Sequence, residues 1–432
     1  MIRSRLRKAI AGVCAAATAL GLLVATPGAV QAAPIYPSKS HDKWYYVKPS
    51  VYKNKPHGTL LKHRTLILPQ FPGAAMEQMV FVSTNSHGKK ISATASLLRQ
   101  VHSYAIPNTP VLVYNHFINS LGVDCQPSYA LTTPIDKFKN IEGLQTVAEI
   151  TLGLNLALKK GWNILLPDFE GMNSAYGANV LAGHISLDAV NALTSTRKFN
   201  LQRAPIVLAG YSGGAMATLF AAVQQPKYSP RPRYVGAIAG GSPVDMEWMG
   251  VTLGNRPNPG FGIVVGSLIG LEREYPNRMN IFGRMKPKYK NLMRGPGKDA
   301  CVATLLSYYA GQSFPSVFNG VDINKAWPER KVARENSIIN DMRAPKMPIF
   351  FYHGNQDIAV PISKVKQLAK RYCKAGTKVS MTTMDLSEHL LVGFLGLPWA
   401  AAYADGRFAN LPAPNDFCEG KSINYGAPSS QK

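Results

Sequence analysis

Six consecutive residues, Gly210–Ala215 with the sequence GYSGGA, place a serine between an apolar strand-type run and a helix-type run of small residues. A sharp strand-to-helix turn needs small neighbours, because the serine backbone is strained and the helix packs close to the strand. Gly210, Gly213 and Gly214 supply that room. The pattern predicts a nucleophile elbow that exposes the hydroxyl of Ser212, and the alternative is an ordinary glycine-rich turn.

A serine nucleophile needs a base that takes its proton and an acid that orients the base. In a strand–serine–helix fold of this kind, the acid and then the histidine follow the serine along the chain. Of the nine histidines, only His353 and His389 follow Ser212. Asp357 comes shortly after the apolar run that ends at Tyr352, and His389 follows it. The predicted catalytic triad is therefore Ser212, Asp357 and His389.

Other acids and one other histidine have alternative interpretations. Asp341 and Asp385 are the other candidates for the triad acid, and Asp357 could instead cap the following helix. His353 is expected to pack beneath the loop rather than to react. Three carboxylates that precede the serine in the chain are interpreted as groups that fix loops: Asp168, Glu170 and Asp188.

Two amide donors are expected to form an oxyanion hole. The first is the amide of Gly213, directly after the serine, and the second comes from the loop after the early strand at 110–114. Asn119 and Ser120 on that loop are the two candidates for the second donor. Spacing alone leaves the choice between them open.

The elements that must position these residues alternate between strand and helix. Residues 33–75 form a leader, and two alternating segments around the turn at 85–88 predict a hairpin. Short, continuous apolar runs then alternate with helical spacing, which indicates a mostly parallel sheet with helices on both faces. The runs expected to be strands are 110–114, 162–166, 206–209, 234–239 and 348–352, and those expected to be helices are 144–160, 181–193 and 213–224.

The alternation stops between residues 245 and 343, a stretch that predicts a largely helical cap inserted into the core. The core would thus consist of residues 33–244 and 344–432. Within the cap, the glycine-rich apolar segment Gly260–Leu271 is expected to face an acyl pocket, to form the core of the cap, or both.

The first 32 residues have a basic start, an apolar middle and small residues at Val30 and Ala32. This pattern predicts a secretory signal peptide cleaved after Ala32. The formal net charge is +24, but the positive residues are scattered and not interleaved with aromatics, so nucleic acid is not an expected partner. A basic exported protein suits an anionic cell envelope or a lipid interface, although a plain solvated surface explains the charge equally well.

Four of the five cysteines lie beyond the signal peptide: Cys125, Cys301, Cys373 and Cys418. An even number of cysteines in an exported chain indicates two disulfides. None of the four forms a CxxC pair, which argues against zinc or redox chemistry.

Four motifs together resemble the secretory lipase family. They are Asp124–Tyr129 (DCQPSY), Gly210–Ala215 (GYSGGA), Gly240–Val244 (GGSPV) and Glu388–Leu390 (EHL). The resemblance implies an α/β-hydrolase fold with a helical cap and hydrolysis of carboxylic esters of acylglycerols. It also implies the disulfides Cys125–Cys301 and Cys373–Cys418, and a flap near the active site formed by residues after about Leu397. The family favours an acidic residue near the oxyanion loop, where this chain has Asn119 and Ser120.

We therefore expect a secreted serine lipase or esterase that needs no metal or organic cofactor. The alternatives are a serine acyltransferase or exopeptidase on the same fold, or a non-catalytic hydrolase-like binding protein. An exopeptidase would need an acidic anchor for a substrate amine, and the predicted cap has few acids. The intact serine, aspartate and histidine argue against a binding protein.

Overall fold

The computed structural model describes residues 32–40, 42–132, 154–321, 325, 328–385, 388–421 and 423–425. The predicted signal peptide therefore lies outside the described residues except for Ala32, and so does the first part of the helix predicted for 144–160. Among the described residues, no helix combines the length and the apolar character that crossing a membrane requires.

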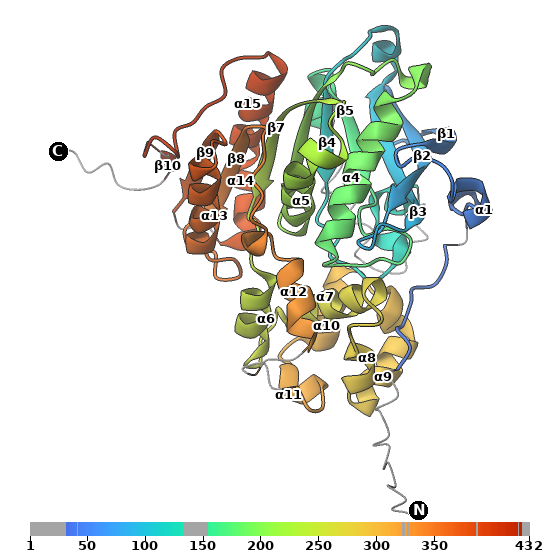
Figure 1. The fold of residues 1–432 in the computed structure, drawn as a ribbon, viewed down its shortest axis with the longest axis vertical. Helices are drawn as coiled ribbons and strands as arrows, with labels where there is room; N and C mark the ends of the chain where they lie inside the picture. The colour runs from blue at the N-terminus through green and yellow to red at the C-terminus, as the bar shows by residue number, and fades with distance from the viewer. Residues whose placement is uncertain are drawn as a thin grey trace, which may run out of the picture.

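Ten strands in the described part of the chain form a sheet with the order β1-β2-β3-β5-β4-β6-β7-β8-β9-β10 (Figure 1). Strands β1 to β3 are antiparallel, and the strands from β5 to β10 along this order run parallel to one another. The hairpin and the parallel strands predicted from the sequence are thus present. The strands are β1 (Leu60–Ile67), β2 (Ala74–Thr84), β3 (Lys90–Gln100), β4 (Val111–Asn115), β5 (Asn163–Pro167), β6 (Pro205–Tyr211), β7 (Arg233–Gly240), β8 (Ile349–Gly354), β9 (Val379–Met384) and β10 (Ile423–Tyr425).

The central strands are buried on both faces, which explains their continuous apolar sequences. In β6, Ile206 and Leu208 belong to the core beneath one set of helices, whereas Val207 and Ala209 belong to the core on the opposite face. The first core contains residues of α4 (Asn179–Thr194), α5 (Gly213–Tyr228) and α13 (Ile362–Lys374), and the second contains residues of α14 (His389–Leu395) and α15 (Leu397–Phe408). Helices thus cover both faces of the sheet, as expected for the predicted α/β fold class.

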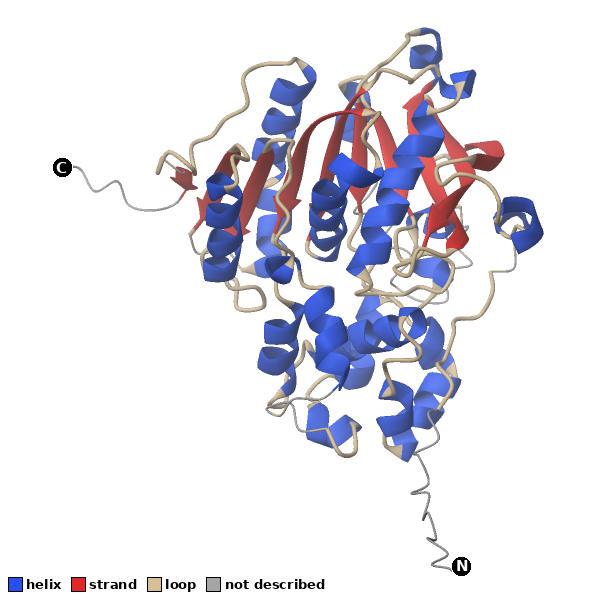
Figure 2. Cartoon of the chain, viewed as in Figure 1, coloured by secondary structure: helices blue, strands red, loops and turns tan. Residues whose placement is uncertain are grey.

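A group of helices lies below the sheet, beyond one end of its strands (Figure 2). It is formed by the chain between β7 and β8. These helices are α6 (Met246–Gly254), α7 (Phe261–Glu274), α8 (Ile281–Arg284), α9 (Pro287–Arg294), α10 (Val302–Tyr309), α11 (Phe314–Val317) and α12 (Pro328–Glu335). Helix α7 is almost entirely buried, because its apolar residues pack on α6, α10 and α12. The leader crosses to this group, where the amide and hydroxyl of Ser38 donate to the carboxylate of Asp299 at 2.6 and 2.7 Å.

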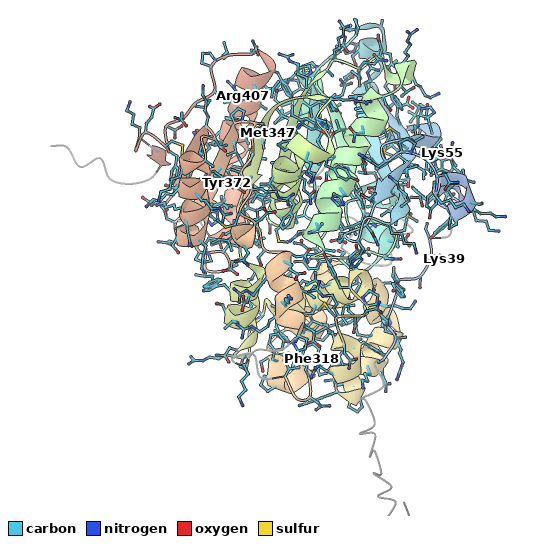
Figure 3. The ribbon with its side chains drawn as sticks, in the orientation of Figure 1. Lys39, Lys55, Phe318, Met347, Tyr372 and Arg407 are labelled. Atoms are coloured by element: carbon cyan, nitrogen blue, oxygen red, sulfur yellow. A yellow bond between two sulfur atoms is a disulfide. The ribbon has the colours of Figure 1, made fainter. Side chains whose placement is uncertain are left out.

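Side chains fill both the sheet region with its covering helices and the group of helices between β7 and β8 (Figure 3). Phe318 is buried among the helices of the lower group, and Met347 and Tyr372 are buried beside the sheet. Lys39 and Lys55 lie exposed at the margin. Two short helices are α1 (Pro49–Tyr52) and α2 (Pro127–Ala130), and residues 154–159 are also helical.

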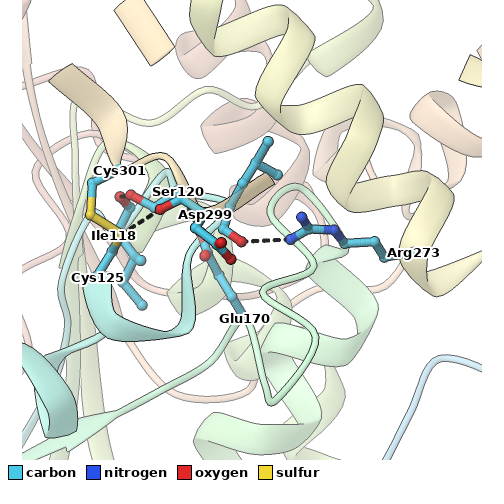
Figure 4. The surroundings of a disulfide bond; sticks show 8 residues. Ile118, Ser120, Cys125, Glu170, Arg273, Asp299 and Cys301 are labelled. Atoms are coloured by element: carbon cyan, nitrogen blue, oxygen red, sulfur yellow. Dashed lines mark hydrogen bonds between the residues drawn. A yellow bond between two sulfur atoms is a disulfide. The ribbon is translucent and has the colours of Figure 1, made fainter. Parts of the chain in front are cut away.

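Both disulfides implied by the resemblance are formed. Cys125 bonds to Cys301 and Cys373 bonds to Cys418, with Cα–Cα distances of 5.6 and 5.5 Å. Cys301 is the residue that caps the start of α10, so the first bond joins the loops after β4 to the helical group (Figure 4). The second bond joins α13 to the chain beyond α15.

Candidate active site

The turn at Ser212 has the strained backbone that the sequence predicts. Ser212 lies between β6 and α5 with φ of 51° and ψ of −120°, a conformation that non-glycine residues rarely adopt. A Cβ atom on Gly210 would come within 2.3 Å of the backbone oxygen of Gly214. A Cβ atom on Gly214 would come within 1.8 Å of the backbone oxygen of Asn115, so the helix can pack here only without side chains.

The three residues of the predicted triad form a continuous hydrogen-bonded chain. Nε2 of His389 lies 2.8 Å from Oγ of Ser212, and Nδ1 of His389 lies 2.7 Å from Oδ2 of Asp357. Oδ1 of Asp357 accepts the amides of Ala359 and Val360 at 3.0 and 2.8 Å, which fixes the carboxylate on the loop after β8. This arrangement leaves the carboxylate to accept the Nδ1 proton, so that Nε2 presents its lone pair to the serine hydroxyl.

Two further residues hold the histidine in place, and neither of these roles is predicted from the sequence. The carboxylate of Glu388 accepts the amides of Leu390 and Leu391 at 3.0 and 2.8 Å and thus caps the start of α14. The hydroxyl of Tyr211 donates to the backbone oxygen of His389. Each of them directly precedes a triad residue, in the motifs GYSGGA and EHL. Their positions in these motifs are the feature of the sequence from which their roles could have been predicted.

The alternative acids have other partners, and the second histidine lies beside the triad acid, with its Nε2 at 3.4 Å from Oδ2 of Asp357. Asp341 forms an ion pair with Arg343, and Asp385 accepts a hydrogen bond from Asn355. His353 is fully buried beneath the loop, with Nε2 at 2.8 Å from the backbone oxygen of Val360. Burial lowers the pKa of His353, which keeps this ring neutral.

The two predicted second donors differ in what surrounds them. The amide of Ser120 donates to Oε1 of Glu170 at 3.3 Å and its hydroxyl donates to the backbone oxygen of Ile118 at 2.5 Å, so both of its donors are committed. Ser120 therefore has no donor left over for an oxyanion in this arrangement. Asn119 has φ of 47°, and its side chain lies directly against Gly213, where an added Cβ atom would meet Oδ1 at 1.8 Å.

Two of the three carboxylates that precede the serine bind loops as predicted, whereas Asp188 lies in α4 and bonds to a strand and a helix as well as to the loop residue His57. Asp168 accepts the amide of Ser128 at 3.0 Å, and Glu170 accepts that of Ser120. Burial raises the pKa of Asp168 to about 7 and that of Glu170 well above its ordinary value. Asp188 accepts the hydroxyls of Ser83 and Tyr228, and so joins α4 to β2 and α5.

A large and mainly apolar pocket opens at Ser212. Its volume is about 1240 Å³, which exceeds that of a typical small-molecule site. The walls come from the sheet, the helical group and the C-terminal helices, and they include Trp162, Ile263, Leu306, Phe394 and Leu397. This lining suits a long hydrocarbon chain, because few polar groups are left to be desolvated.

Helix α7 contributes less of this wall than the sequence suggested. Gly260 and Ile263 line the pocket, but Leu268 is buried against α6 in a separate small cavity. The segment Gly260–Leu271 therefore serves both purposes, with its first turn in the pocket and the rest in the core of the helical group. Helical periodicity explains the division, because residues on opposite sides of one helix contact different surroundings.

Known proteins share this fold and this sequence pattern. The family model described as secretory lipase matches residues 136–416. The chain is 29% identical to lipase A of Arthroderma benhamiae over 401 residues, which are 88% of this chain and 81% of the relative. It is 28% identical to lipase 1 of Candida albicans, over 85% of this chain and 80% of the relative. It is also 27% identical to the probable trichothecene esterase of Stachybotrys chartarum, over 88% and 78% of the two chains.

Solved structures share the architecture at lower identity. The structure of Candida antarctica lipase A superposes with a TM-score of 0.79 at 23% identity, over 89% of this chain and 88% of that one. The rice cell wall degrading esterase of Xanthomonas oryzae superposes with a TM-score of 0.64 at 16% identity, over 82% and 100% of the two chains. The fold is therefore the α/β-hydrolase fold, and the protein is a carboxylic ester hydrolase. The chain belongs to the secretory lipase family.

Proposed function

We propose that this protein hydrolyses esters of long-chain fatty acids, including acylglycerols, through an acyl-enzyme on Ser212. The observation that carries the proposal is the chain from Asp357 to His389 to Ser212, with links of 2.7 and 2.8 Å, at the base of a large apolar pocket. The names of the related lipases support the same substrate class.

Acylation begins when Oγ of Ser212 attacks the ester carbonyl carbon while Nε2 of His389 takes the hydroxyl proton. The carboxylate of Asp357 holds the ring in the required tautomer and stabilises its positive charge. The carbonyl oxygen becomes an oxyanion, which accepts a hydrogen bond from the amide of Gly213. His389 then gives its proton to the departing alcohol oxygen, and the acyl group remains on Ser212.

Asn119 is the proposed second donor, and it acts through its side-chain amide. Its side chain lies against Gly213, and the backbone amides of Asn119 and Ser120 both stabilise the carboxylate of Glu170. A carboxamide has two N–H donors and no charge, so it stabilises an oxyanion at any pH where the protein is folded.

Deacylation repeats the same steps with water in place of the alcohol. His389 takes a proton from water, the hydroxide attacks the acyl carbon, and the fatty acid leaves as Ser212 regains its proton. An acyltransferase would use an acceptor alcohol at this step, and an exopeptidase would use an amide substrate, with the same three residues. The apolar lining of the pocket favours the lipid ester over a charged peptide.

An exposed apolar surface beside the pocket suits a lipid interface. We call it the apolar rim, and its residues are Ile358, Leu390, Leu391, Phe394, Leu395 and Leu397. Ile358 is 87% exposed and Phe394 is 59% exposed, and both also line the pocket. An apolar surface that continues into the active-site pocket is a means of drawing a lipid substrate from an aggregate into the site.

Charge supports the same association. The chain has a formal net charge of +24, and Lys159 and Lys160 line the pocket beside the exposed Leu156. Attraction to an anionic lipid surface or cell envelope would add to the apolar contact.

The proposed domain organisation follows from the same arrangement. Residues 1–32 are the signal peptide that directs export, residues 33–244 and 344–432 form the catalytic core, and residues 245–343 form the cap. Residues after Leu397 are the proposed flap, because α15 lines the pocket through Leu397, Ala401 and Ala404.

Hydrolysis of p-nitrophenyl esters from acetate to palmitate, together with triolein emulsion, tests this function. We expect kcat/KM to rise with chain length, triolein to be cleaved, and every activity to be absent in the Ser212→Ala variant. Cleavage limited to acetate esters would contradict the proposed substrate, and activity in the variant would contradict the mechanism.

A further inference from the structure

A buried guanidinium joins helix α7 to the loops around the active site. Arg273 is 2% exposed, and its side chain donates to five backbone oxygens from four separate segments of the chain. The acceptors, at distances of 2.7 to 3.0 Å, are the backbone oxygens of Ile35, Leu121, Asn173, Ser174 and Lys298. Only an arginine side chain has enough donors in a planar array to make all these contacts.

One of these acceptors lies on the loop that carries Asn119. Nη1 of Arg273 donates to the backbone oxygen of Leu121 at 2.7 Å (Figure 4). The amide of Leu121 donates to the backbone oxygen of Ala300 at 2.9 Å, and the disulfide of Cys125 anchors the same loop a few residues further on. The loop is thus attached to the helical group at several points, of which Arg273 is the most deeply buried.

Glu170 holds the same loop from its other side. The carboxylate is 2% exposed, and Oε1 accepts the amide of Ser120 at 3.3 Å. Burial raises the pKa of this carboxyl, and the positive charge of Arg273 partly opposes the rise. Successive backbone groups of the loop are therefore fixed by a buried acceptor and a buried donor, with the amide of Ser120 on Glu170 and the oxygen of Leu121 on Arg273.

This double attachment has a consequence for Asn119, which precedes Ser120 directly. Asn119 holds a left-handed backbone conformation, with φ of 47°, that costs about 1 kcal/mol or more and persists only where the surroundings enforce it. Its side chain must stay against Gly213 to stabilise the oxyanion. A misplacement of a catalytic group by about 1 Å can reduce a rate by about 100-fold.

We infer that Arg273 and Glu170 are positioning residues for the oxyanion loop, and that they act on catalysis through Asn119. This inference rests on the proposed function. It assigns helix α7 a part in transition-state stabilisation in addition to its part in the pocket wall. The expected signature of the loss of either residue is a lower kcat with an almost unchanged KM, because the acyl pocket stays intact.

The test compares Arg273→Lys with Arg99→Lys in the full-length secreted protein. Arg99 is a matched control, because its side chain is also buried and its hydrogen bonds go to backbone oxygens. The two nearest acceptors are the oxygens of Phe199 and Ser103, at 2.8 and 2.7 Å. Arg99 is part of β3, and none of its three acceptors is a pocket-lining residue. Both lysine variants keep the charge and lose the planar array of donors.

The measurements are kcat and KM on a soluble p-nitrophenyl ester, and the inhibition constant of an alkyl trifluoromethyl ketone. This ketone adds to the serine and forms a tetrahedral oxyanion in the oxyanion hole. For Arg273→Lys we expect kcat to fall by about 10- to 100-fold, the inhibition constant to rise by about the same factor, and KM to change by less than about threefold. For Arg99→Lys we expect kcat per titrated active site, KM and the inhibition constant to stay within about twofold of the parent values, even if the variant unfolds more easily.

Equal behaviour of the two variants would overturn the inference. If Arg273→Lys does not fold, the pair Glu170→Gln and Glu170→Leu decides, since glutamine keeps an acceptor for the amide of Ser120 and leucine does not. The inference predicts near-normal kcat for glutamine and a loss of about 10-fold or more for leucine, and equal kcat for both would overturn it. The Ser212→Ala variant is measured in parallel. If this variant hydrolyses the ester as fast as the parent, the proposed function itself is wrong, and not only the role of Arg273 and Glu170.

Discussion

Two helices begin at catalytic residues, and they lie in opposite environments. Helix α5 follows Ser212, and its residues from Gly213 to Gln224 are all buried between the sheet and α4. Helix α14 begins at His389, and Val392 is its one buried residue, while Leu390, Leu391, Phe394 and Leu395 are exposed.

The difference shows that the two catalytic groups are held in different ways. Packing against strands and helices fixes Ser212, and its strained backbone persists because the surrounding core enforces it. Hydrogen bonds fix His389, through Asp357 to its ring, through the hydroxyl of Tyr211 to its backbone and through the Glu388 cap. Helix α14 can therefore expose an apolar face without loss of the catalytic geometry.

The largest expected effect comes from removal of the base. His389→Ala should lower kcat by about a millionfold, because no other group can take the serine proton. The stability of the fold should hardly change, since the ring is partly exposed and α14 is capped by Glu388. Single-turnover kinetics and thermal unfolding of the same preparation check both expectations, and a residual rate within about 100-fold of the parent would exclude His389 as the base.

The next effect comes from the acid that orients the base. Asp357→Asn should lower kcat by about 10⁴-fold, because an asparagine can stabilise the wrong tautomer of His389 and cannot stabilise its positive charge. Asp385→Asn is the control, as this acid accepts a hydrogen bond from Asn355, whereas Nδ1 of His389 bonds to Asp357. Similar losses in the two variants would argue against Asp357 as the triad acid.

A matched pair of glycines measures how differently the two helices are packed. Gly214→Ala in α5 should reduce the free energy of unfolding by about 3 kcal/mol, because the new methyl group meets the backbone of Asn115. Gly393→Ala in α14 should change it by less than about 1 kcal/mol, because the nearest atom is 3.1 Å away in the Tyr211 side chain and alanine favours the helix. Urea unfolding of the two variants tests this, and equal losses would contradict the comparison.

The apolar rim should matter for lipid aggregates and not for soluble esters. Replacing both Leu391 and Phe394 with serine should lower binding to anionic phospholipid vesicles and the rate on triolein emulsion by about 10-fold. Hydrolysis of p-nitrophenyl acetate should stay within about twofold. Ile67→Ser, at a more exposed position on β1, should alter neither rate, and a similar loss there would remove the special role of the rim.

The last expected effect is the pH dependence of stability that a buried acid causes. Burial raises the pKa of Asp168 to about 7 in the folded protein, so the native state holds a proton that the unfolded chain releases near pH 4. Stability from this group is full below pH 4 and falls as the pH rises to about 7, by at most about 1.4 kcal/mol per pH unit. Asp168→Asn should flatten this decline in urea unfolding at pH 4 to 8, and an unchanged slope would contradict the assignment.

Much of the site could be predicted from the sequence because the residues that carry it depend on local patterns. The glycines around Ser212 mark the elbow, and the order of residues along the chain selects Asp357 and His389. The pairing of the cysteines followed from the resemblance and not from spacing.

Other features depend on contacts between distant segments, which no local pattern records. The commitment of Ser120 to Glu170 lies in a contact across 50 residues. The carbonyl cluster around Arg273 spans from Ile35 to Lys298. The sequence predicts that the helix after Ser212 ends near residue 224, whereas α5 continues to Tyr228 and contains Pro226.

The central claim is that Ser212 is a nucleophile activated by His389, and covalent labelling tests it most directly. The protein is treated with a long-chain fluorophosphonate, and intact mass, peptide mapping and residual esterase activity are followed together. We expect one adduct per chain, located on Ser212, that forms in step with the loss of activity and forms far more slowly in His389→Ala. An adduct on another residue, or full activity in a fully labelled protein, would contradict it.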